Sequence, residues 1–104
     1  RWTTGYPATV NHEAETAHAA EAARRVAGRV DTEAAPLMGA EDFAYVLEKV
    51  PGAMFFLGVA PEGADWKHCC GIHSTRMMVD ESALPRGAAF LAGLAQDWLA
   101  QGFR

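Results

Sequence analysis

The fold that we expect is built around the apolar residues Met54-Phe55-Phe56-Leu57-Gly58-Val59. It lacks the alternation of apolar and polar residues that marks a strand with one face in water. A short, continuously apolar run of this kind suits a strand that is buried on both faces of a layered sheet. Gly58 allows another backbone to approach closely. We therefore expect these residues to form a central strand.

Three helices are expected around this strand, at His12–Arg29, Glu41–Val50 and Arg86–Gln101. The first is rich in alanine, and Asn11 can cap its start. The second has apolar residues at i, i+3, i+4 and i+7, which give it one apolar face. Pro85 can occupy the first turn of the third. Helices alternating with extended segments predict an α/β fold, with helices packed on a mixed sheet.

Length and charge limit the possible classes of protein. A chain of 104 residues, half of them apolar, can form one compact domain and is too short for two. Its net charge of -4 argues against a nucleic-acid partner. The longest apolar run, Ala53–Ala60, is strand-sized, so we expect no membrane span. No export signal opens the sequence, which favours the cytoplasm, and Arg1 in place of Met suggests a fragment or a processed product.

The two cysteines, Cys69 and Cys70, are adjacent. Neighbouring cysteines rarely bond to each other, so we expect no disulfide framework. Cys70 and His73 have a spacing found in zinc sites, but a closed site needs four ligands and no second pair is present. His12 and His18 lie in the first predicted helix and are interpreted as surface residues. An autonomous zinc site is therefore disfavoured.

The candidate site is the loop-like stretch Gly71-Ile-His-Ser-Thr-Arg-Met-Met-Val-Asp80. From the residues alone, His73 is a metal ligand, a general base or a polar loop residue. Arg76 is able to bind a substrate carboxylate, or it is simply solvated. Ser74 has no base and acid partners that would make it the nucleophile of a serine hydrolase.

A second candidate lies at Gly39 and Ala40, before the second predicted helix. Backbone amides at a helix start can hold an anion such as a substrate carboxylate. Alternatively, Glu41 and Asp42 simply stabilise the helix start through its dipole. Both interpretations remain open from the sequence.

Three blocks carry a resemblance to a known family: Gly39-Ala-Glu-Asp-Phe-Ala44, Ile72-His-Ser74 and Asp80-Glu-Ser-Ala-Leu-Pro-Arg-Gly-Ala88. With the apolar strand between them, they resemble the C-terminal part of the hippurate hydrolase and indole-acetyl-amino-acid hydrolase branch of the aminoacylase and carboxypeptidase G family. These are dinuclear metallopeptidase-like enzymes, and the resemblance extends from about Tyr6 to Leu99. It implies that residues 1–10 end an inserted smaller domain for lid or dimerisation functions. Residues 11–104 would then be the C-terminal part of the metal-binding catalytic domain.

The resemblance also implies a function for the parent protein, a metal-dependent amidohydrolase that cleaves N-acyl amino acids, hippurate-like ones included, with a metal-activated water. His73 would bind one of two divalent ions, zinc or manganese, and Gly39, Ala40 and Arg76 would contact the substrate. The remaining metal ligands and the catalytic glutamate would lie in an earlier part of the parent, so no catalytic residue is assigned to this chain and it is expected to be inactive alone. The parent could be a homodimer.

Two departures from the family pattern lie in the same loop. Thr75 stands where many members have proline, and Met77-Met78 replace a more usual aromatic pattern. The alternative to an enzyme segment is a non-catalytic structural or dimerising module derived from the same fold. The coding sequence upstream of Arg1 would distinguish them, because an enzyme requires a Cys/His/Asp-containing metal segment there.

Overall fold

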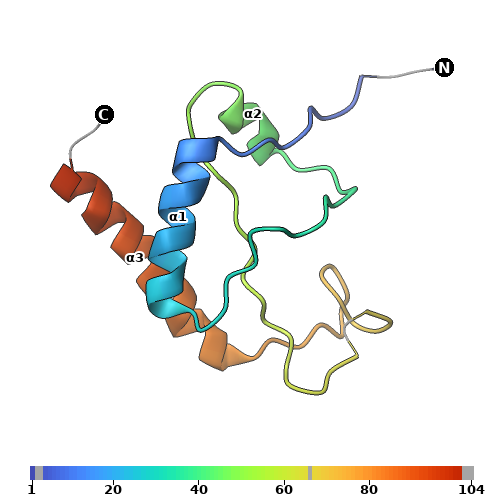
Figure 1. The fold of residues 1–104 in the computed structure, drawn as a ribbon. Helices are drawn as coiled ribbons and strands as arrows, with labels where there is room; N and C mark the ends of the chain where they lie inside the picture. Colours follow the sequence, from blue (N-terminus) through green and yellow to red (C-terminus); the bar gives the residue numbers. More distant parts are fainter. Residues whose placement is uncertain (2–3, 66, 102–104) are drawn as a thin grey trace. The chain divides into compact units, whose positions relative to one another are not determined.

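A computed structural model describes residues 1, 4–65 and 67–101, shown in Figure 1. Positions 2–3, 66 and 102–104, which include parts of both predicted domain segments, lie outside the described residues. The chain divides into two compact units, Arg1–Phe55 and Phe56–Arg104. The first contains helices α1 (Glu13–Val26) and α2 (Phe43–Leu47), and the second contains the 3-10 helix η1 (Glu81–Ala83) and helix α3 (Leu84–Gln101).

Helix α1 confirms the first predicted helix but ends earlier, at Val26 instead of Arg29. Glu13 and Glu15 lie in its first turn, and two arginines lie in its last turn. This arrangement places charges of the favourable sign at both ends of the helix dipole. The alanine-rich sequence gives the helix its propensity, and three of its alanines, at positions 19, 20 and 22, are buried.

The residues before α1 do not cap it as predicted. The side chain of Asn11 instead pairs with the backbone of Met54, accepting from its N–H at 2.8 Å and donating to its carbonyl at 3.0 Å. His12 is the N-cap residue without a side-chain cap; its N–H donates to the Gly52 carbonyl at 3.0 Å, and its Nδ1 accepts from the Gly52 N–H at 3.1 Å. The interpretation of His12 as a plain surface residue is therefore wrong, because His12 links the start of α1 by hydrogen bonds to Gly52, in the segment after α2.

Helix α2 lies where the second helix was predicted, but it has five residues instead of ten. Its end has a local cause: the N–H groups of Lys49 and Val50 both donate to the Val46 carbonyl, which tightens the last turn. Ala44 and Leu47 are 0% and 5% exposed and form the buried side of this short helix. The helix therefore contributes a small part of the core of the first unit.

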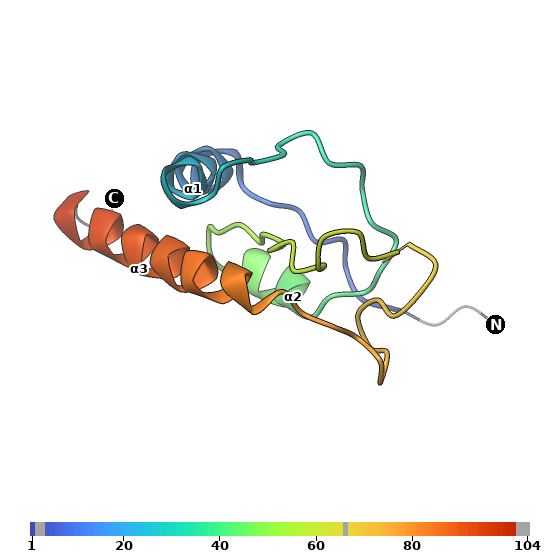
Figure 2. The ribbon, with the colours of Figure 1, turned by 90° about the horizontal axis from the view of Figure 1, so that it is seen from below.

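In the second unit, η1 leads directly into α3, the long helix labelled in Figure 2. The Asp80 carboxylate accepts from the Ser82 N–H at 3.0 Å and so caps η1. Helix α3 confirms the third predicted helix and begins two residues earlier, with Pro85 in its first turn. No helix in the described part of the chain is long and apolar enough to cross a membrane.

The predicted central strand is absent, since the described residues contain helices and loops and no strand. Met54–Val59 has no regular secondary structure, and the side chains of Phe56 and Leu57 are 73% and 46% exposed. The α/β sheet is therefore not part of this structure. The physical reason is that a strand forms only beside a neighbouring strand that pairs with its backbone, and the described ranges supply none.

Candidate functional site

The predicted site lies in a loop of the second unit that is built from consecutive turns. The Cys69 N–H donates to the Asp65 carbonyl at 2.9 Å, the Ser74 N–H to Gly71 at 3.0 Å and the Met77 N–H to Ser74 at 3.1 Å. These bonds satisfy backbone groups that no helix or strand reaches. The expectation of a loop around His73 is confirmed, and the loop has a defined conformation.

His73 is the third residue of the Gly71–Ser74 turn and has a φ angle of 70°. A positive φ at this place is typical of a type II turn, which normally has glycine there. Cys70, at 66°, is the other non-glycine residue with positive φ in the described part of the chain. A residue with a Cβ in this conformation costs about 1 kcal/mol or more relative to glycine. Such backbone strain is concentrated at functional sites.

The ring of His73 is available for binding. The residue is exposed, and its imidazole makes no hydrogen bond or ion pair with another residue of the described ranges. However, the described residues contain no group of three or more His, Cys, Asp or Glu side chains that could hold a metal ion. A metal site needs more than one imidazole. Within the described residues His73 therefore has no partners that would complete a metal site, and its role as a metal ligand stays a prediction.

Ser74 and Arg76 follow His73 in the same loop. The Arg76 N–H donates to Ser74 Oγ at 3.1 Å, so the hydroxyl stabilises the next turn. The side chain of Arg76 is exposed and forms no ion pair within the described part of the chain. The structure thus places His73 and Arg76 three residues apart on one loop.

Gly39 and Ala40 belong to the first unit, in the connection that precedes α2. Both are exposed. The Phe43 N–H, at the start of α2, donates to the Glu41 carboxylate at 3.1 Å. Glu41 therefore stabilises the helix start, as the alternative interpretation of this segment expected. The substrate contacts of Gly39 and Ala40 stay a prediction.

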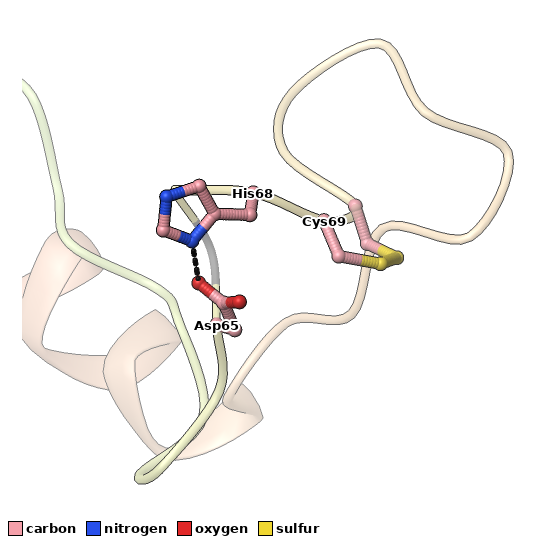
Figure 3. Close-up of polar contacts among 4 residues, drawn as sticks. Asp65, His68 and Cys69 are labelled. Atoms are coloured by element: carbon pink, nitrogen blue, oxygen red, sulfur yellow. Dashed lines mark hydrogen bonds and ion pairs between the residues drawn. A yellow bond between two sulfur atoms is a disulfide. The ribbon is translucent and has the colours of Figure 1, made fainter.

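Cys69 and Cys70 are joined by a disulfide, so the prediction that these neighbours would not bond is wrong (Figure 3). The prediction considered only their adjacency in sequence and could not include the left-handed conformation of Cys70. A bridge between adjacent residues closes the shortest possible loop and contributes only about 1 kcal/mol through chain entropy. In this state neither sulfur is a thiolate, so Cys70 and His73 cannot act together as metal ligands.

One polar pair in this loop, Asp65 and His68, was not predicted from the sequence. His68 Nδ1 lies 2.8 Å from Asp65 Oδ1, and Figure 3 shows this pair apart from the disulfide. The Asp-x-x-His spacing within one turn was the available signal. Both side chains are largely exposed, so this hydrogen bond contributes little to stability.

The candidate stretch ends at Asp80, whose carboxylate has its pKa lowered by hydrogen bonds. The Asp80 carboxylate accepts hydrogen bonds from the side chain and from the backbone N–H of Ser82. These bonds, the side-chain one being the larger cause, hold the pKa of Asp80 below its ordinary value of 3.8. The positive charge of Arg86 acts in the same direction. Asp80 is therefore ionised at neutral pH and caps the segment that leads into α3.

Sequence comparisons identify the family. Residues 1–97 match the sequence pattern of Peptidase family M20/M25/M40, and the chain belongs to this family. It is 43% identical to YhaA of Bacillus subtilis (strain 168) over 96 residues, which are 88% of this chain and 23% of that protein. No solved structure matches it.

Two further relatives carry functional names. The chain is 38% identical to IAA-amino acid hydrolase ILR1-like 6 of Arabidopsis thaliana, over 90% of this chain and 20% of the relative. It is 41% identical to thermostable carboxypeptidase 1 of Saccharolobus solfataricus, over 86% and 22%. The chain therefore spans about a fifth of the length of these curated relatives. The predicted family is confirmed, and these two relatives are named as hydrolases.

Proposed function

We propose that this chain is a segment of a larger metal-dependent amidohydrolase that releases an amino acid from an N-acyl amino acid. The observation that carries the proposal is His73, an exposed imidazole held at a positive φ in the Ile-His-Ser block of a family member. The names of two relatives support the reaction class. One is an IAA-amino acid hydrolase and the other a carboxypeptidase, and both names describe cleavage that frees an amino acid.

In this proposal, His73 is one ligand of a divalent ion, zinc or manganese, in the parent protein. A neutral imidazole is a common ligand for such ions, and its second nitrogen needs an acceptor to orient it. When bound, two such ions would supply an activated water for attack on the amide carbonyl. The Gly71–Ser74 turn fixes the backbone of His73. In the parent, this turn would set the direction from which the imidazole reaches the metal ion.

Substrate binding is assigned to groups that suit a carboxylate. The exposed guanidinium of Arg76, three residues after His73, offers several donors to the carboxylate of a hippurate-like substrate. The backbone amides of Gly39 and Ala40 are the second proposed contact. The acyl group and the preference for one amino acid would depend on parts of the parent beyond these residues.

The exposed apolar segment suggests how the chain fits into the parent. Phe56 is 73% exposed and Leu57 is 46% exposed, although their stretch has the composition of a buried strand. We propose that Met54–Val59 becomes a sheet strand in the full-length protein, which would restore the predicted α/β fold. Residues 1–10 would end the smaller inserted domain, and residues 11–104 would complete the catalytic domain, in a parent that can be a homodimer.

The test compares the full-length protein with the 104-residue chain, each incubated with benzoyl-glycine and with zinc or manganese. The full-length protein should release glycine, and the isolated chain should not, because the described residues bring together no group of three or more metal-binding side chains and the catalytic glutamate is expected in another part of the parent. Glycine release by the isolated chain above a metal-only blank would show that the site is complete without the parent. Absence of hydrolysis of any N-acyl amino acid by the metal-loaded parent would refute the proposed activity.

A second candidate is a non-catalytic structural or dimerising module. One observation favours it: the described residues contain no cluster that could hold a metal. It predicts a full-length protein that retains no divalent metal after desalting and hydrolyses no amide, with dimerisation lost when the chain is deleted. Metal retention by the parent together with hydrolysis would exclude it.

A further inference from the structure

We propose that Cys69 and Cys70 form a thiol–disulfide switch that holds the His73 turn in place when oxidised and releases it when reduced. The change of conformation is confined to the loop that carries the two cysteines and His73. The consequence for metal binding rests on the proposed function of His73.

The disulfide is open to small thiols. Cys69 is exposed, Cys70 is half-buried, and both lie in a loop without helix or strand. Figure 3 shows the bridge projecting away from the His68 and Asp65 pair, so that pair does not cover it. Exposed disulfides are generally the reducible, regulatory ones, whereas structural disulfides resist the cellular thiol pool.

The position of the bridge links it to His73. Cys70, at φ 66°, connects the turn that closes on Asp65 to the turn that begins at Gly71 and carries His73. The bridge forms a small ring that contains the peptide between the two cysteines. This ring restrains rotation about ψ of Cys69 and φ of Cys70, and these rotations set the direction of the second turn relative to the first.

Reduction removes this restraint. A residue with a Cβ disfavours the left-handed region, so Cys70 leaves it when the ring opens. The Gly71–Ser74 turn then loses its fixed direction, and His73 moves with it. Because the bridge joins neighbours and no distant segments, this change stays local and leaves the helices of the second unit unaffected.

The reaction consumes two small thiols, such as two molecules of glutathione. The thiolate of the first attacks Sγ of Cys69, which breaks the bridge, forms a mixed disulfide and releases the Cys70 thiolate. The second thiolate attacks the outer sulfur of the mixed disulfide and releases the Cys69 thiolate. The two protons of the small thiols end on the cysteines. The two electrons come from the small thiols, which leave as their disulfide.

The chemistry is tested by alkylation of the full-length protein with iodoacetamide, before and after treatment with glutathione. Trypsin cuts after Lys67 and Arg76 and isolates the peptide His68–Arg76, which contains both cysteines. The oxidised protein should give an unalkylated peptide two hydrogen masses lighter than the dithiol, and the reduced protein a doubly alkylated one. Full alkylation without reductant, or no reduction by glutathione, would overturn the proposal.

The structural effect is tested by amide hydrogen exchange of Ser74, whose N–H closes the His73 turn. The reduced protein and the C69S/C70S variant should both lose protection at Ser74, and glutathione should have no effect on the variant. Protection at Glu81–Gln101 serves as the control and should not change. Equal protection of Ser74 in the oxidised and reduced protein would refute the switch.

The metal consequence is measured as zinc affinity of the full-length protein. Reduction and the C69S/C70S variant should each weaken binding by about 10-fold, the lower end of what supporting groups around a metal ligand contribute. Unchanged affinity would refute the coupling to His73. If H73A also leaves zinc affinity unchanged, the proposed function fails, while alkylation and Ser74 exchange still decide whether the switch exists.

Discussion

Replacing His73 with glycine or with alanine separates the imidazole from the backbone strain beneath it. At φ 70°, the Cβ of His73 costs about 1–2 kcal/mol relative to glycine. Glycine also makes the unfolded chain more flexible, which offsets about 0.4–1 kcal/mol of that gain. The net stabilisation of the turn by His73→Gly is therefore about 0.5–1 kcal/mol, a factor of about two to five. His73→Ala keeps the Cβ and removes a ring that is exposed, so it should leave the turn unchanged.

The assay is amide hydrogen exchange at Ser74, whose bond to the Gly71 carbonyl at 3.0 Å reports closure of this turn. His73→Gly should raise Ser74 protection two- to fivefold over the native protein, and His73→Ala should match the native protein. Asparagine, which tolerates a positive φ better than other residues, should fall between them. A loss of protection with glycine, or an equal gain with alanine, would refute the claim that His73 is held in a strained conformation.

Two further predictions concern the second unit. In α3, Gly93→Ala should raise the free energy of unfolding by about 0.5–1 kcal/mol, because alanine has the higher helix propensity and nothing lies within 4 Å of the new methyl. Gly87→Ala should gain less, since its Cβ would lie 2.9 Å from Leu57 Cδ2 and must displace it; equal gains measured by calorimetry would show that Leu57 does not pack there. The lowered pKa of Asp80 means that its cap stabilises the fold at pH above 3.8 and is lost as the pH falls through the lowered value. An NMR titration should place the Asp80 midpoint below 3.8, and a midpoint at or above it would contradict the hydrogen bonds described.

The helices were predictable because their signals are local. Alanine content and end charges define α1, and the proline in its first turn helps to define α3. The strand at Met54–Val59 was not found in the structure, because a strand depends on partners that its own residues do not specify. Asn11 was predicted as a helix cap and instead pairs with Met54, since a side-chain amide offers the same donor and acceptor as a backbone peptide.

The residues of the candidate site could be predicted from the sequence, but their backbone conformation could not. The resemblance selected His73 and the family is confirmed, yet nothing in the sequence indicated its positive φ. Strain of this kind depends on how consecutive turns join. The Cys69–Cys70 bridge was missed for the same reason, because bonding between neighbours depends on the conformation of the loop and not on spacing.

The most direct test of the account is the metal content of the full-length protein, measured by mass spectrometry after desalting. His73→Ala and His73→Gly should both lower the retained metal and weaken its binding by 10-fold or more, although only the glycine variant changes the stability of the turn. His68→Ala is the matched control, an exposed histidine of the same loop paired with Asp65, and should keep the native metal content. If both His73 variants retain metal with native stoichiometry and affinity, His73 is not a ligand and the account is wrong.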